Sequence, residues 1–273
     1  MSSGNRYGFS KDTIPIPNPK PLQEPYKIPD PIAINAPNPI PEPFILPTTQ
    51  VVNFTFEDNN MVGWVVVDEP PHLLAENMKS RWEIADGPIS GKALMQTSNI
   101  WGDKGDTVPL GTFIIYDLQT WYNFTMEFDL YAMDNDAIGI VWGWWNRFRH
   151  HRFITMIDPA NPTGAPPELR GPFSRIERRI GDAPPYYETL ASVRQAAYTE
   201  YKIEHLKLEV NDRLFKVYSN NSLILQARDG RYWGGRVGFM LYAHSGVYFD
   251  NIRIESIVPD VSNQMYRFTS YDR

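Results

Sequence analysis

The sequence predicts an all-β fold, an antiparallel β-sandwich, with about a dozen strands after Val51. Three observations support this prediction. Hydrophobic and polar residues alternate with a period of two from Val51 onward. The alternating runs are short, and turns such as Asn211-Asp212 and Gly234-Gly235 separate them. A helix is indicated at one place only, residues 188–198. Many short strands joined by such turns are typical of sandwiches.

The first half of the predicted sandwich contains eight strands in chain order. Residues 52–56 alternate Val and Phe with Asn and Thr, and 64–68 and 82–87 are runs that each begin with a Trp. Residues 94–98 and 111–117 continue the extended pattern. The clearest strand is 123–131, where apolar residues at even positions alternate with polar residues at odd positions. Two more strands follow at 138–145 and 153–157.

The last five strands follow closely upon one another. They are expected at 201–210, 214–218, 223–228, 237–243 and 247–255, with Asn- or Gly-containing turns between them. The segment 158–187, rich in Pro, Gly and Arg, interrupts the series and is predicted to be a long insertion loop.

Two tails flank the predicted sandwich of residues 51–258. Residues 259–273 are a short C-terminal tail. Residues 1–50 hold 12 of the 24 prolines and form a predicted extended arm. Apolar side chains are interleaved with these prolines, which favours a strap lying on a partner or on its own domain, although a semi-rigid linker is the alternative. The expected contact residues are Ile14, Ile16, Leu22, Tyr26, Ile28, Ile32, Ile40 and Phe44.

Composition excludes several classes of protein. The net charge of −6 argues against a nucleic-acid binder, and the absence of cysteine excludes disulfide scaffolds and thiolate metal sites. The sequence contains no apolar run of 18 residues, the length expected of a transmembrane segment, and no Sec signal is visible. We therefore expect a cytoplasmic protein, one peripheral to a membrane complex, or part of a particle.

Four segments resemble a known group of folds. They are residues 128–144, which hold an acidic turn between two strands, and residues 201–212, 234–243 and 246–254 near the end of the chain. These segments resemble the laminin-G-like and thrombospondin C-terminal group of concanavalin-like jelly rolls. The resemblance implies the fold over residues 51–257 and leaves function open, because such folds host lectins, glycosidases and structural modules.

The acidic turn is a candidate cation site. Asp134, Asn135 and Asp136 offer the oxygen ligands that Ca²⁺ prefers, and Asp250 is a possible further ligand. The resemblance implies that some relatives bind calcium near this turn. The alternative is that Asp and Asn simply suit a tight turn, and that Asp250 accepts structural hydrogen bonds.

Arginine is concentrated in one segment. Seven arginines lie between residues 147 and 179 of this acidic chain. Since guanidinium groups bind carboxylates and phosphates at interfaces, the expected targets are an acidic protein, lipid headgroups or a glycan. The alternative is pairing with the acidic residues of the chain itself. The arginines predicted to contact a partner are Arg170, Arg175, Arg178 and Arg179.

Tryptophan is concentrated in the strand 138–145. The period of two predicts that Trp142 and Trp144 share one face and that Trp145 takes the other. Trp144 and Trp145 are candidates for stacking on a ligand, with core packing as the alternative. The adjacent His150 and His151 are expected on opposite faces of their strand, which makes them a poor metal pair.

The function that these patterns favour is a non-enzymatic structural or accessory subunit of a larger assembly, anchored to other protein subunits by the arm and the arginines. The first alternative is a carbohydrate-binding module, with calcium as a possible structural ion. The second is a glycoside hydrolase, which needs two facing carboxylates. No E-x-D-x-x-E pattern of concanavalin-like glycosidases is present, so we expect no enzyme.

Overall fold

The computed structural model describes residues 49–69, 79–102 and 105–257. The predicted C-terminal tail and nearly all of the predicted arm lie outside the described residues. The same holds for all eight predicted contact residues of the arm: Ile14, Ile16, Leu22, Tyr26, Ile28, Ile32, Ile40 and Phe44. Their role stays a prediction.

The described residues form an all-β structure, as predicted, with fifteen strands and one short 3-10 helix, η1 (Pro167–Leu169). The strands are β1 (Val51–Phe54), β2 (Trp64–Asp68), β3 (Trp82–Asp86), β4 (Lys92–Gln96), β5 (Thr112–Trp121), β6 (Phe124–Ala132), β7 (Ala137–Asn146), β8 (Arg149–Met156), β9 (Phe173–Arg179), β10 (Tyr187–Val193), β11 (Ile203–Asn211), β12 (Leu214–Ser219), β13 (Ser222–Arg228), β14 (Gly235–Tyr242) and β15 (Val247–Ser256). Among the described residues, no helix is long and apolar enough to cross a membrane.

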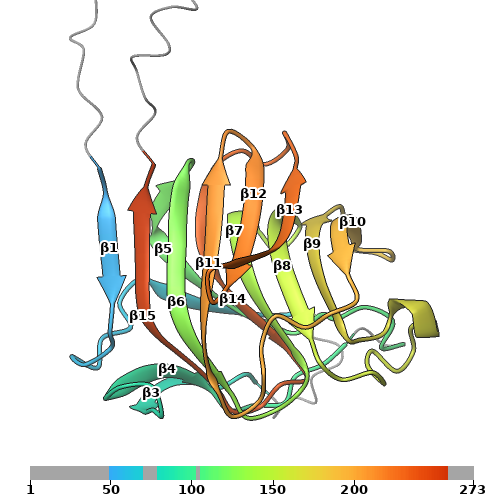
Figure 1. The fold of residues 1–273 in the computed structure, drawn as a ribbon, viewed down its shortest axis with the longest axis horizontal. Helices are drawn as coiled ribbons and strands as arrows, with labels where there is room; N and C mark the ends of the chain where they lie inside the picture. Colours follow the sequence, from blue (N-terminus) through green and yellow to red (C-terminus); the bar gives the residue numbers. More distant parts are fainter. Residues whose placement is uncertain (1–48, 70–78, 103–104, 258–273) are drawn as a thin grey trace, which may run out of the picture. The chain divides into compact units, whose positions relative to one another are not determined.

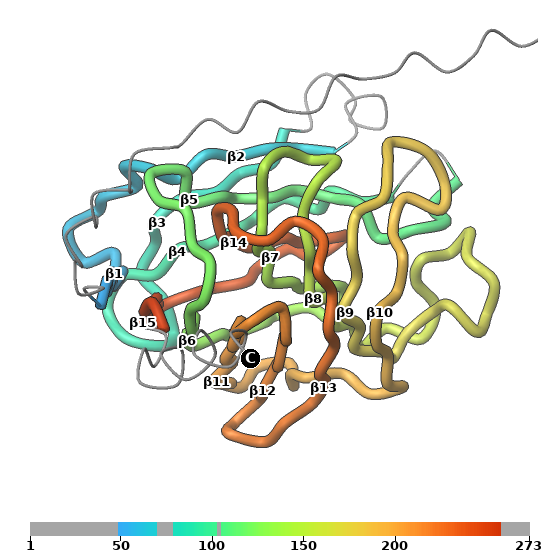
Figure 2. Tube along the Cα trace, turned by 90° about the horizontal axis from the view of Figure 1, so that it is seen from above, coloured from blue at the N-terminus to red at the C-terminus, as the bar shows by residue number. Residues whose placement is uncertain are grey.

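The strands pair antiparallel in two sheets that form a sandwich (Figure 1). The eight-stranded sheet has the order β13-β12-β11-β6-β15-β4-β3, with β1 also paired to β15. The seven-stranded sheet has the order β10-β9-β8-β7-β14-β5-β2. Seen from above, β11, β12 and β13 lie in one layer, and β7, β8 and β9 lie in the other (Figure 2). The predicted antiparallel sandwich is confirmed.

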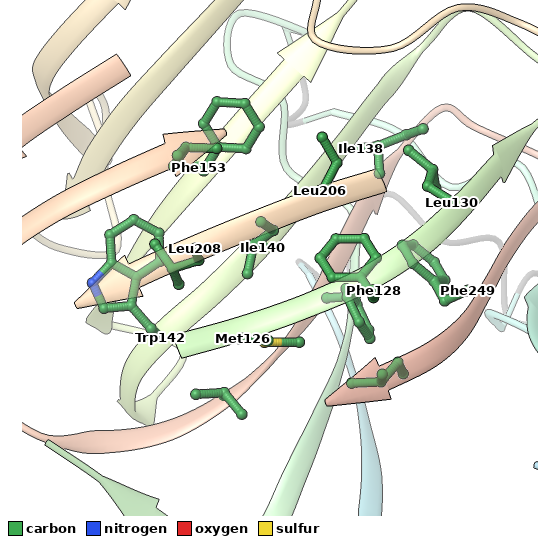
Figure 3. Packing of buried hydrophobic residues seen from close by; sticks show 14 of the residues in the cluster. Met126, Phe128, Leu130, Ile138, Ile140, Trp142, Phe153, Leu206, Leu208 and Phe249 are labelled. Atoms are coloured by element: carbon green, nitrogen blue, oxygen red, sulfur yellow. The ribbon is translucent and has the colours of Figure 1, made fainter. Parts of the chain in front are cut away.

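The main core lies between the two sheets (Figure 3). Strand β6 supplies Phe124, Met126, Phe128 and Leu130, all at most 1% exposed, while its intervening residues are half-buried. This strand follows the period of two because one face packs on the core and the other faces outward.

The seven-stranded sheet is buried on its second face as well. Phe113, Val141 and Ile154 belong to a separate apolar cluster there. The neighbouring loop adds to the burial: the carbonyl oxygen of Pro109 accepts a hydrogen bond from Arg152 Nη1 at 2.6 Å, and Leu110 packs with the ring of Tyr187. A sheet covered on both faces does not produce an alternating sequence pattern.

A bulge at Gly143 corrects the prediction for the tryptophan-rich strand. Between Val141 and Trp144 the strand β7 has one residue more than the facing part of β14. Gly143 has a φ of 58°, and a Cβ there would lie 2.8 Å from the carbonyl oxygen of Tyr232. Trp142 therefore packs in the main core while Trp144 packs on the opposite face of the sheet. The prediction that they share a face is wrong.

Two further predictions for the middle of the chain are corrected. The segment 158–187 is not a loop throughout, because residues 173–179 form the fully buried strand β9. The indicated helix at 188–198 is replaced by strand β10 and the turns after it. The predicted opposite faces of His150 and His151 are confirmed: His150 lies beside Trp144 on one face, and His151 stacks on Trp142 on the other.

Candidate functional site

Four loops meet at one end of the sandwich. They connect β4 to β5, β6 to β7, β8 to β9, and β14 to β15. Backbone hydrogen bonds join them: Ala243 N donates to Ile100 O at 2.7 Å, and Asp158 N donates to Asn135 O at 2.9 Å. This end of the molecule is therefore a connected surface built from segments far apart in sequence.

A pocket of about 260 Å³ opens among these loops. It is called the Asp106–Asp136 pocket below. Its lining is mostly polar and includes one exposed indole ring. The lining residues are Asn99, Trp101, Asp106, Asp136, Asn161, Thr163, Tyr242 and Ala243.

Asp106 is held in place by three hydrogen bonds. Its Oδ2 accepts from the backbone N and the Oγ1 of Thr163, at 2.8 and 2.7 Å, and its Oδ1 accepts from the Tyr242 hydroxyl at 2.7 Å. Asp106 is 7% exposed and has a φ of 49°. Burial, together with the bond to Asp106, raises the pKa of Tyr242, so this hydroxyl remains a donor. The carboxylate is thus fixed in one orientation.

Asp136 is the second carboxyl group of the pocket. It is 8% exposed, and its Oδ1 accepts a hydrogen bond from Asn161 Nδ2 at 2.7 Å. No hydrogen bond to its Oδ2 is found within the described part of the chain. Burial raises the pKa of Asp136 to about 7, and the negative charges of Asp134 and Asp158 add to this shift. Near neutral pH this group therefore exists in both protonation states.

Trp101 provides the apolar part of the pocket. It is 50% exposed and lies in the loop between β4 and β5. A large ring at the rim of a polar hollow offers a flat surface to a ligand. Arg170 supports the opposite loop, since its Nη2 donates to Thr163 O at 2.9 Å and its Nε donates to Ala165 O at 2.8 Å.

The structure separates the residues predicted to hold calcium. Asp134 Oδ1 accepts from Asn135 N at 2.8 Å, and the Asn135 carbonyl accepts from two backbone N–H groups of the β8–β9 loop. Asp250 lies on β15 opposite Asp129, where it accepts a hydrogen bond from Ser90 Oγ at 2.8 Å. Across the described residues, no three acidic or histidine side chains converge as metal ligands would. The predicted residues do not fit one common calcium site.

The arginines predicted to contact a partner have partners within the chain. Arg175 Nη2 donates to Leu169 O at 2.6 Å. Arg178 pairs with Asp229 at 2.6 Å, and Arg179 pairs with Glu69 at 3.0 Å. All three arginines are at most 9% exposed. The alternative interpretation, pairing with the chain's own acids, describes these residues better than a free basic patch.

The two tryptophans predicted to stack on a ligand lie far from this pocket. Trp144 is buried at 6% exposure, whereas Trp145 is 52% exposed. Strand β7 begins at Ala137, beside the pocket, and Trp145 lies near its other end. Of the residues predicted as ligands, the structure brings only Asp136 into the pocket. Sequence reasoning missed Asp106, Asn161 and Thr163, although the Gly- and Asp-rich run after Trp101 is a signal for a functional loop.

Comparison with solved structures gives the fold. A Bacillus subtilis protein of unknown function with a galectin-like fold is 8% identical, with a TM-score of 0.50, covering 75% of this chain and 96% of that one. The carbohydrate-binding module CBM66 from Bacillus subtilis is 18% identical, with a TM-score of 0.49, covering 72% and 98%. A GH16 enzyme from Bacteroides ovatus, solved with a mixed-linkage glucan product, is 8% identical, with a TM-score of 0.49, covering 74% and 98%.

No family model matches this chain, and no curated protein matches it either. At 8% identity and a TM-score of 0.50, the structure with the galectin-like fold bears on the fold alone. The described sandwich has the concanavalin-like jelly-roll fold that the resemblance of the sequence implied.

Proposed function

We propose that the Asp106–Asp136 pocket binds a carbohydrate. The observation that carries this proposal is one hollow that combines two buried carboxyl groups with a half-exposed tryptophan. Sugar hydroxyl groups donate to carboxylates and to amide oxygens, and the apolar face of a sugar ring packs on an indole. Asp106, Asp136 and Trp101 supply these complementary surfaces.

The size of the pocket favours one sugar unit of a longer chain. Its volume of about 260 Å³ is below the roughly 300–1,000 Å³ of pockets that enclose drug-sized ligands. The carboxylate of Asp106 is already oriented by Thr163 and Tyr242, so binding costs little reorganisation there.

A glycan array probed with the full chain tests the proposal, followed by calorimetry on each hit. We expect W101A and D136A to weaken binding at least about tenfold, because each removes one of the two kinds of contact. Leu118, 65% exposed and outside the pocket lining, gives the matched control L118A, which should bind as the unchanged chain does. The proposal would be refuted if no glycan binds, or if W101A and D136A bind the glycan with unchanged affinity.

Glycoside hydrolysis is a second candidate, favoured by one observation. Asp136, with a pKa of about 7, shares a pocket with a second carboxyl group, as in acid–base pairs of glycosidases. We favour binding without catalysis, because the oxygens of Asp106 already accept three hydrogen bonds. Reducing-end release from the bound glycan distinguishes the two: none is expected, and release that D136N abolishes would establish hydrolysis.

The role as a subunit of a larger assembly stays a prediction. It depends on the arm, which lies outside the described residues, and on arginines that have partners within this chain. The native mass of the full chain from its own source, compared with that of a chain lacking residues 1–48, tests it. Co-purifying subunits that the shortened chain loses would support this role.

A further inference from the structure

The end of the sandwich opposite the Asp106–Asp136 pocket exposes three large aromatic side chains. Trp145 and Trp233 are each 52% exposed, and Tyr122 is 49% exposed. Three strands establish that this is the far end: β5 runs from Thr112 to Trp121, β7 from Ala137 to Asn146, and β14 from Gly235 back to Tyr242. Exposed apolar side chains that lie side by side are candidates for an interaction surface.

These rings are held in fixed positions. Trp145 Nε1 donates a hydrogen bond to Gly234 O at 2.9 Å. The ring of Tyr122 lies against the Cα of Gly234, where a Cβ would come within 2.4 Å of it, and meets the Trp233 ring at a centroid distance of 5.4 Å. A rigid aromatic surface binds with a small loss of conformational entropy.

Three arginines surround the rings without a carboxylate partner. The guanidinium of Arg213 lies 5.9 Å from the centroid of the Trp233 ring, and that of Arg149 lies 5.3 Å from the centroid of Tyr232. Arg231 directly precedes Tyr232 in the sequence and lines the same pocket as Arg213 and Trp233. Within the described residues, none of the three forms a salt bridge, whereas the nearby Arg228 and Arg236 pair with Asp212 and Asp117. In a chain of net charge −6, unpaired arginines at one place favour an anionic ligand.

A narrow slot between the rings is lined by two tryptophans whose indole N–H groups lack an acceptor among the described residues. Trp121 and Trp142 both line it and are each 2% exposed. Their Nε1–H groups have no hydrogen-bond partner in the described chain. The slot has a volume of about 10 Å³, the size of one water molecule or hydroxyl group. Buried donors without an acceptor carry a free-energy cost, which a ligand hydroxyl in the slot would remove.

We infer that this end is a second binding site, for an acidic oligosaccharide whose sugar rings stack on Trp145 and Trp233 while its anionic groups pair with Arg149, Arg213 and Arg231. The size of the slot and the indole N–H groups of its lining residues fit one hydroxyl group of the same oligosaccharide. A glycan fits better than an acidic peptide because a stacking surface, unpaired arginines and a slot of the size of a hydroxyl group occur together. This site is independent of the Asp106–Asp136 pocket, which has no arginine in its lining.

Calorimetry on the full chain with four probes tests this inference: an oligogalacturonate, dextran sulfate, neutral dextran and poly-glutamate. We expect an anionic sugar chain to bind, to weaken with rising salt, and to lose about tenfold or more in affinity in W233A and in R213Q. The matched control is R81Q, which removes the same charge from an exposed arginine paired with Glu83. Trp233 and Arg213 are exposed, so both variants should fold, and their melting temperatures check this.

Each outcome decides the matter. Binding of oligogalacturonate identifies carboxylates as the anionic groups, and binding of dextran sulfate alone identifies sulfates. The inference would be overturned if neutral dextran or poly-glutamate bound as tightly as the anionic sugar chain. It would also be overturned if W233A and R213Q left the affinity unchanged. W101A and D136A should leave the affinity for the anionic sugar chain unchanged. The two sites are therefore tested by different variants, and either proposal can fail without the other.

Discussion

Arg152 and Glu177 face each other on β8 and β9, and two nitrogen atoms of the arginine donate to one oxygen of the glutamate. The distances from Nε and Nη2 to Oε2 are 2.9 and 2.7 Å. Both side chains are buried, and the guanidinium carbon lies 3.5 Å from the centroid of the Tyr187 ring. A buried charge survives there because hydrogen bonds and a ring face replace water.

Removing one partner of this pair should be costly. R152M leaves Glu177 charged and buried, so we expect a loss of roughly 3–5 kcal/mol in the free energy of unfolding, measured by urea denaturation. The double variant R152M/E177L should recover much of that loss, since the buried carboxylate is then removed as well and Arg175 keeps its hydrogen bond to Leu169 O. A double variant as unstable as R152M would contradict this interpretation of the pair.

The pH dependence of stability should reveal Asp136. Its pKa is about 7 in the folded protein, above the unfolded value of 3.8, so the folded state holds the proton more tightly. The stability that this group contributes is full below pH 4 and is lost as the pH rises to about 7. D136N removes this dependence, and at pH 8 it should be more stable than the unchanged chain by roughly 1–3 kcal/mol. Equal stabilities at pH 8 would refute the raised pKa.

His244 should give a pH dependence of stability opposite in sign to that of Asp136. It is fully buried, and its ring nitrogens form no hydrogen bond of normal geometry among the described residues, although the backbone of Asp134 and Ser245 lies close to them. Burial lowers its pKa to about 4. Since the unfolded histidine titrates near 6.5, stability is lost as the pH falls from 6.5 to 4. H244L should therefore equal or exceed the unchanged chain at pH 7, by up to about 1 kcal/mol, and exceed it further at pH 5. Thermal melts at both pH values check this, and a variant much less stable at pH 7 would mean that the ring has a partner.

Calcium removal should leave stability unchanged. Asp134 accepts backbone hydrogen bonds at the acidic turn, and Asp250 belongs to a different acidic group beside Ser90. Melting temperatures with calcium and with a chelator should agree. A rise of several degrees with calcium, abolished in D134N, would restore the calcium site that the resemblance implies.

The sequence predicts strands best where only one face is buried. In β6 and β11 apolar residues alternate with polar ones, because each strand packs on the core on one side and faces outward on the other. Strand β9 is buried on both faces, and its Arg175, Glu177 and Arg179 satisfy each other or a neighbouring strand. Its composition therefore resembles that of a solvated loop, which is why the sequence predicts a loop there.

The pocket was less accessible to prediction than the strands. Asp106 and Asp136 lie 30 residues apart in different loops, and hydrogen bonds from Tyr242 and Thr163 hold Asp106 in place. Those contacts depend on how the strands that flank these loops pair, and alternation alone does not give the register. The acidic turn singles out Asp136 as a candidate ligand of a cation. Its position in the lining of a pocket, beside Asn161, follows only from the three-dimensional structure.

Fluorine NMR of the full chain labelled with 5-fluorotryptophan tests the central claim most directly. The chain has eight tryptophans, and single Trp→Phe variants assign their resonances. Titration with a neutral glycan selected on the array should shift the resonance of Trp101 and leave those of Trp145 and Trp233 in place. A glycan that binds without moving the Trp101 resonance would contradict a carbohydrate site in the Asp106–Asp136 pocket.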